Sequence, residues 1–142
     1  MGELLEERRR FIRYPIYCPA QYKRQSVLFR DPSITINISE GGALITTRKG
    51  IDISSGLILR FCFKGKDFNI RSRVVHVQYD IQSSLYSVGV EFLERPVDFI
   101  MNFYAEIGTI MLLQRKLTEE SGTEISLAEA SIKWYSDVPA WQ

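Results

Sequence analysis

The sequence predicts a mainly β protein with a C-terminal α-helical part: a six-stranded antiparallel barrel, then one long helix and a shorter helical tail. Three observations predict this fold class. Between residues 14 and 93, short runs of alternating apolar and polar residues are separated by turn residues, as in small antiparallel barrels. From residue 96 onward the apolar residues change to helical spacing. With 142 residues, 45% of them hydrophobic, the chain is long enough for one domain with its own core.

The first strands are predicted from proline and isoleucine positions. Pro15 and Pro19 confine a strand over about residues 16–24 to an edge or entry position, because proline cannot donate to a ladder. Isoleucine then occupies every second position from 34 to 38, with polar residues between. This alternation predicts a half-buried strand whose isoleucines share one face. A turn at 40–42 precedes another short apolar strand.

The remaining strands are predicted from alternation and turn chemistry. Leucine or phenylalanine occupies every second position from 57 to 63, with other residues between them. The following Lys-Gly-Lys at 64–66 is typical of a hairpin turn. The returning strand is expected at about 68–79, a turn at 80–84 and a last strand at 86–93. Strict alternation assigns the residues of the returning strand to two opposite faces, Val75, Val77 and Tyr79 on one and Val74, His76 and Gln78 on the other.

The helical part is predicted to begin at Pro96, which favours a first turn, and to end near residues 119–122. Its apolar stripe either packs across an open end of the barrel or forms a dimer or partner interface. Thr123 is expected to cap a second short helix that continues to Trp134 and Tyr135. The stripe consists of Ile100, Phe103, Tyr104, Ile107, Ile110, Met111, Leu113 and Leu117.

Composition narrows the function classes. The two cysteines, Cys18 and Cys62, form no CxxC motif and have no histidine cluster beside them, which argues against a zinc site, and no cofactor is expected. No run approaches the length of a membrane span, so we expect a cytoplasmic protein without membrane insertion. Residues 1–30 carry seven basic and three acidic side chains, and residues 94–142 carry four and eight. The basic N-terminal end is therefore the expected anion site.

Two short segments contain the residue types expected to bind a ligand. Residues 8–13 hold four arginines in six positions, and guanidinium suits bidentate capture of phosphate and of the acceptor edge of guanine. Residues 37–42, Asn-Ile-Ser-Glu-Gly-Gly, set an amide, a hydroxyl and two glycines into one turn. Such residues let a backbone approach a ligand closely and bond to it.

This pairing resembles the signature of the PilZ domain family, RxxxR followed by [D/N]xSxxG. Arg9 and Arg13 match the first motif, and Asn37, Ser39 and Gly42 match the second. The segment Ser-Val-Gly-Val-Glu-Phe at 87–92 resembles the strand that closes PilZ barrels, so the resemblance covers about residues 8–95. The family binds cyclic di-GMP, a bacterial second messenger.

The resemblance also implies residue roles. Arg9 and Arg13 would contact phosphate and guanine, and the turn would meet the ligand through its side chains and backbone amides. Arg8 occupies a position at which family members with a basic residue often bind a stacked pair of ligands, so one or two ligands per chain stay open. The implied cyclic di-GMP site consists of Arg8, Arg9, Arg13, Asn37, Ser39, Gly41 and Gly42.

The expected organisation is a flexible Arg-rich arm at 1–13, a barrel at 14–95 and a helical extension at 96–142 that packs on the barrel or a partner. The sequence is interpreted as a stand-alone receptor or adaptor that signals by ordering the arm. A downstream protein partner is expected, and a homodimer through the C-terminal helices is possible.

The sequence favours three other function classes less. Isolated carboxylates and a lone His76, excluded from the site, give no catalytic set, so an enzyme is not expected. The main alternative is a PilZ-like scaffold that binds a protein and no nucleotide. RNA or single-stranded DNA binding would need surface aromatics between basic residues; no DNA partner is predicted.

Overall fold

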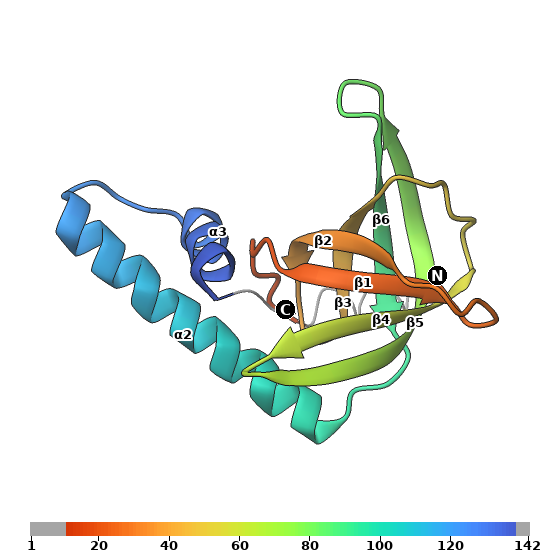
Figure 1. Cartoon of the computed structure of the whole chain (residues 1–142), viewed down its shortest axis with the longest axis horizontal. Coiled ribbons are helices and arrows are strands. Elements are labelled where there is room, and N and C mark those ends of the chain that lie inside the picture. The colour runs from red at the N-terminus through yellow and green to blue at the C-terminus, as the bar shows by residue number, and fades with distance from the viewer. Residues whose placement is uncertain (1–10, 139–142) are drawn as a thin grey trace.

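The computed structural model describes residues 11–138. Six strands close into an antiparallel barrel in the order β1-β2-β3-β6-β5-β4, and two helices follow (Figure 1). The predicted fold class is therefore confirmed. The strands are β1 (Pro19–Arg24), β2 (Asp31–Ile38), β3 (Gly42–Thr47), β4 (Gly56–Phe63), β5 (Lys66–Asp80) and β6 (Leu85–Phe92).

The β4–β5 hairpin forms as the sequence predicts. Its two loop residues, Lys64 and Gly65, have φ angles of 53° and 79°. A two-residue loop with both φ angles positive matches the right-handed twist of the flanking strands. The alternation along β4 is also confirmed, because Leu57, Leu59 and Phe61 are fully buried in the core.

A register shift in β2 overturns the predicted isoleucine face. The shift lies between Thr35 and Asn37, so the residues before and after it point to opposite sides. Thr35 is completely buried, whereas Ile34 is 39% exposed. The Thr35 hydroxyl compensates for its burial by donating to the Ile16 carbonyl at 2.5 Å and accepting from the Cys18 amide at 2.8 Å. Local alternation cannot reveal such a bulge.

A second bulge corrects the predicted faces of β5. Pairing with β6 is regular up to Val74 and resumes at His76, which leaves Val75 as the extra residue. Val74 is buried at 1% exposure, and beyond the bulge Val77 packs against the core. His76 and Gln78 therefore remain together on the outer face, but Val74 does not share it.

Helix α2 (Val97–Ser121) closes one end of the barrel. It starts after Pro96, as predicted, and ends at Gly122, whose φ of 69° is a left-handed C-cap. Phe99, which the predicted stripe omitted, and Phe103 are buried, with ring centroids 5.9 and 5.8 Å from that of Phe63. These rings join the barrel core to the first half of the helix.

Helix α3 (Leu127–Asp137) folds back between α2 and the segment that leads into β1 (Figure 1). Ser126 caps it and accepts a hydrogen bond from the Glu129 amide at 3.0 Å, so the expected cap at Thr123 is wrong. On the side facing the barrel, the buried Ser131 accepts from the Tyr17 amide at 3.0 Å. Trp134 is half-buried against the core.

Candidate functional site

A backbone pairing outside the regular strands brings the two motifs together. The Tyr14 amide donates to the Ile38 carbonyl at 2.8 Å, and the Ile38 amide donates to the Tyr14 carbonyl at 3.0 Å. The pairing fixes Arg13, the residue before Tyr14, close to Asn37, the residue before Ile38. Residues 24 positions apart in the sequence thus become neighbours at the end of the barrel that α2 covers.

The turn between β2 and β3 is held by Ser39. Its amide donates to the Gly42 carbonyl at 2.8 Å, and its hydroxyl accepts from the Gly41 amide and donates to the Gly42 carbonyl, both at 3.2 Å. Ser39 is only 4% exposed. The serine that the sequence places in the binding motif therefore stabilises the shape of the turn.

Both glycines of this turn are closely packed, Gly42 against backbone and Gly41 against a side chain. A Cβ on Gly42 would lie 2.4 Å from the Val90 carbonyl oxygen of β6, closer than real Cβ contacts. A Cβ on Gly41 would lie 2.7 Å from the Phe11 ring. Gly42 therefore allows the turn to join the β3–β6 ladder, and Gly41 allows Phe11 to lie on the turn.

Strand register builds a row of side chains across the outer face of the barrel. Asn37 of β2 pairs with Leu44 of β3, Leu44 pairs with Gly89 of β6, and Gly89 pairs with His76 of β5. Paired residues project to the same side of a sheet, and three strand spacings separate the ends of the row by about 14 Å. Because Gly89 has no side chain, the row is lowest between Leu44 and His76.

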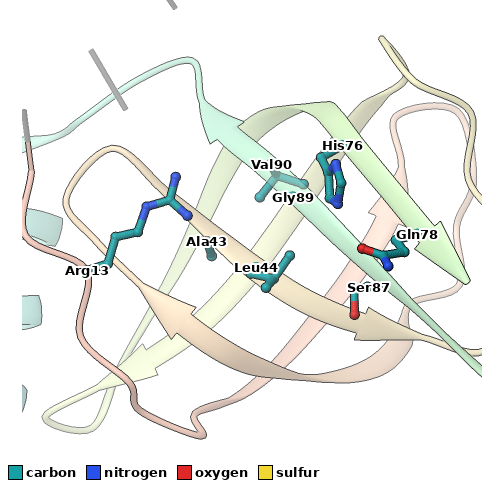
Figure 2. A pocket seen from close by; sticks show the side chains of 8 residues that line it. All are labelled: Arg13, Ala43, Leu44, His76, Gln78, Ser87, Gly89 and Val90. Carbon is teal, nitrogen blue, oxygen red and sulfur yellow. The ribbon is translucent and has the colours of Figure 1, made fainter. Parts of the chain in front are cut away.

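This low point belongs to a hollow of about 320 Å³, which we call the outer-face trough. A second register row contributes Ser87 and Gln78. Figure 2 shows the Arg13 side chain reaching from the N-terminal segment toward the β3–β6 surface, with His76 and Gln78 on β5 at the other side. The trough is lined by Arg13, Ala43, Leu44, His76, Gln78, Ser87, Gly89 and Val90.

The lining combines a flat apolar floor with polar groups at the edges. Leu44 and Gly89 offer a surface on which a planar ring can lie. Arg13 brings a permanent positive charge, while His76 and Gln78 bring hydrogen-bonding groups. The side-chain amide of Asn37 makes no hydrogen bond to any group of residues 11–138, so it is available to a ligand. This chemistry suits a planar, hydrogen-bonding anion.

Glu40, the central residue of the turn, connects it to α2. Its carboxylate accepts from Arg95 Nη1 and from the Tyr104 hydroxyl, each at 3.1 Å. The Arg95 guanidinium also lies 4.8 Å from the centre of the Phe11 ring. Burial raises the pKa of Tyr104, and its hydrogen bond to Glu40 raises it further.

The structure places the predicted residues in three groups. Arg13 lines the trough and Asn37 lies on its edge row. Ser39, Gly41 and Gly42 shape the adjoining turn. The predicted residues Arg8 and Arg9 lie outside the described part of the chain.

Sequence reasoning missed most of the trough. It assigned neither Gln78 nor Ser87 to the site, and it excluded His76 because a lone histidine on a strand is most often structural. The available signal was Gly89, since a glycine inside a strand often marks a close approach by a ligand or another backbone.

Within residues 11–138, no group of three or more His, Cys, Asp or Glu side chains is arranged to hold a metal ion. Neither helix of this part is long and apolar enough to cross a membrane.

Several solved structures resemble this one in fold, each at low sequence identity. MotI/DgrA of Bacillus subtilis, an inhibitor of motility, is 16% identical with a TM-score of 0.59, over 72% of this chain and 51% of that one. MrkH of K. pneumonia in its complex with c-di-GMP is 16% identical with a TM-score of 0.53, over 78% and 52%. YcgR of Escherichia coli in complex with c-di-GMP is 13% identical with a TM-score of 0.55, over 81% and 50%.

These likenesses show a shared fold, and the matched region spans about half the length of each of these neighbours. No curated protein matches the sequence. The model of the PilZ domain matches residues 7–101, more than half of the chain. This match includes both motifs, every strand of the barrel and the start of α2, and the chain therefore belongs to the PilZ domain family.

Proposed function

We propose that this PilZ domain is a receptor for cyclic di-GMP that binds the dinucleotide between the turn at 37–42 and the outer-face trough. The observation that carries the proposal is the Tyr14–Ile38 pairing, which holds Arg13 beside the second motif and over the trough. Two of the structural neighbours, MrkH and YcgR, were solved with this ligand. A shared fold does not by itself imply a shared ligand, and the side chains of the trough supply the matching chemistry.

In the proposed complex, the arginines bind the charged parts of the ligand. Arg13, together with Arg9, takes a phosphodiester oxygen or the N7 and O6 acceptors of guanine. One guanine lies over Leu44 and Gly89, where the glycine contributes no side chain and the His76 side chain stands beside it. The edge of that ring reaches His76.

The turn contributes by shape and by the Asn37 amide. Ser39 holds the conformation of the turn that follows Asn37, whose strand partner is Leu44 of the trough, and Gly41 and Gly42 leave room for the backbone and for Phe11. Direct contacts of Ser39, Gly41 and Gly42 with the ligand would come from their backbone groups.

We further propose that the receptor signals through its N-terminal arm and its helices. Binding would order residues 1–13 over the turn, because ligand phosphates neutralise the mutual repulsion of the arginines. Arg8 would hold a second, stacked ligand. The ordered arm, the barrel at 14–95 and the helical extension at 96–142 then present one surface to a downstream protein partner or to a second copy through the C-terminal helices.

Calorimetric titration tests the receptor function. Cyclic di-GMP should bind the parent protein, and GMP should bind far more weakly because it offers one guanine and cannot bridge both motifs. Arg13→Ala should weaken binding about tenfold or more, since a charged hydrogen bond contributes roughly 1.5–3 kcal/mol. Arg115→Ala, at an exposed position on α2, is the matched control and should bind like the parent.

The same experiment separates the alternatives. Absence of binding by a folded parent would favour a protein scaffold, and tighter binding of a single-stranded oligonucleotide would favour a nucleic-acid protein. The arm mechanism needs its own readout, namely slower hydrogen exchange in residues 1–13 with ligand present. Two ligands per parent chain and one per Arg8→Ala chain would support the stacked pair.

A further inference from the structure

Large apolar side chains project into solvent from two connections at one end of the barrel. The β1–β2 connection exposes Leu28 at 89% and Phe29 at 83%, and the β3–β4 connection exposes Ile53 at 62%. Residues 25–30 and 48–55, which we call the distal loops, lie at the end of the barrel away from α2 (Figure 1). Exposing such residues in water is unfavourable, and clustering them on loop tips is typical of a contact surface.

Cations surround these tips. The distal loops and the strand ends beside them carry five basic side chains, those of Lys23, Arg24, Arg30, Arg48 and Lys49, against the two carboxylates of Asp31 and Asp52.

Only one of these cations is paired within residues 11–138: Lys49 lies 3.8 Å from Asp31. One guanidinium nitrogen of Arg30 is buried there without a hydrogen-bond partner. The folded domain thus leaves most of this positive charge uncompensated, although the net charge of the whole chain is only +1.

The two loops form one surface. Val27 and Phe29 of the first loop and Lys49 of the second line the same hollow, of about 280 Å³. The proposed ligand turn at 37–42 lies at the opposite end of β2 and β3, beside α2. A partner on the distal loops would therefore leave both the turn and the helices accessible.

We propose that the distal loops dock the domain on an anionic lipid bilayer. Leu28 and Phe29 enter the interfacial layer, and the surrounding cations contact lipid phosphates. The binding is peripheral, since these side chains reach the interface and nothing in this surface spans a bilayer. Burial of apolar side chains and electrostatic attraction both contribute to such binding. The attraction raises the partition coefficient about fivefold per basic residue.

The shape of the surface favours a bilayer over an acidic protein. The apolar groups stand on convex tips ringed by cations, and a soft planar interface accommodates such tips without a matching pocket. A stable protein interface instead buries about 800 Å² on each side around packed aromatic anchors. Phe29 is the one exposed aromatic side chain on the described distal loops.

Vesicle sedimentation of the full chain without nucleotide tests the proposal, independently of cyclic di-GMP binding. The parent should bind vesicles of phosphatidylcholine and phosphatidylglycerol in equal amounts, and bind phosphatidylcholine alone at least tenfold more weakly. Leu28→Ser combined with Phe29→Ser should lower the partition coefficient about tenfold or more. Arg24→Gln combined with Arg48→Gln should lower it by a similar factor.

Matched controls come from elsewhere on the chain. Ile81 is 84% exposed at the tip of the β5–β6 hairpin, so Ile81→Ser removes a similar apolar group and should leave binding unchanged. Arg115→Gln is the charge control. The proposal is overturned by equal binding to both vesicle types, by an equal loss in Ile81→Ser, by unchanged binding of the Leu28/Phe29 variant, or by loss only on replacing Arg8–Arg10.

Discussion

The Tyr104 hydroxyl of α2 donates a hydrogen bond of 3.1 Å to the carboxylate of Glu40, the central residue of the turn between β2 and β3. Arg95, in the connection between β6 and α2, binds the other oxygen of that carboxylate at 3.1 Å. Two side chains from the helical side thus hold one residue of the proposed binding turn. A movement of the turn on ligand binding would therefore act directly on α2 through these two contacts.

Removing the Tyr104 hydroxyl tests this connection. Tyr104→Phe should destabilise the domain by no more than about 1 kcal/mol, because the pair is partly exposed and water replaces the lost bond. It should also lower the affinity for cyclic di-GMP about two- to fivefold, since the turn is less well ordered before binding. Tyr79→Phe, at a comparably exposed tyrosine of β5, is the control in urea unfolding and titration. Equal effects of the two variants would contradict the connection.

Replacing Gly42 should be costly. Gly42→Ala places a Cβ 2.4 Å from the Val90 carbonyl oxygen, and backbone atoms cannot yield as a flexible side chain does. We expect a loss of about 1–3 kcal/mol in the free energy of unfolding, together with weaker ligand binding. Gly108→Ala in α2 meets no atom within 4 Å and should stabilise the protein by roughly 0.5–1 kcal/mol. A neutral Gly42→Ala in chemical denaturation would show that the turn tolerates displacement.

The sequence predicted features that local chemistry determines. The Lys64-Gly65 turn and the C-terminal end of α2 at Gly122 depend on neighbouring residues alone, and both were placed correctly. The buried face of β2 was not, because the bulge after Thr35 is a feature of the pairing with β3, which alternation within β2 does not show.

The same distinction applies to the site. The spacing of the two motifs led to the prediction of Arg13 and Asn37, which lie at the trough, as ligand-binding residues. His76 was excluded as a lone histidine on a strand; its position beside Gly89 depends on the register between β5 and β6 and on the bulge at Val75. No local pattern encodes that register.

Helix α3 is predicted to be needed for stability. Tyr135 donates to the buried carboxylate of Glu106 at 2.9 Å, and the Lys64 amide donates to the same carboxylate at 3.1 Å. Truncation after Glu120 removes Tyr135 and exposes the surface under Ala130, so it should lower the melting temperature or change the oligomeric state. Thermal unfolding and size-exclusion chromatography measure both. An unchanged melting temperature and elution volume would show that α3 is dispensable.

Stability should fall in alkaline solution because of Cys18. Complete burial raises the pKa of this thiol from 9.0 to about 12. The unfolded chain releases the proton above pH 9 while the folded chain retains it, so the stabilisation is full below pH 9 and is lost between about pH 9 and 12. The slope from this group is at most about 1.4 kcal/mol per pH unit. Cys18→Ala should flatten the decline in urea unfolding, and an identical slope in the variant would assign the decline to other groups.

The most direct test of the central claim is a map of backbone amide chemical shifts as cyclic di-GMP is added to the isotopically labelled protein. If the ligand lies over the outer-face trough, the largest changes should fall on Asn37, Leu44, His76 and Gly89, with smaller ones along the turn at 39–42. Amides of the distal loops should remain unchanged. Saturating ligand without shifts along the row from Asn37 to His76, or with shifts confined to other surfaces, would contradict the proposed site.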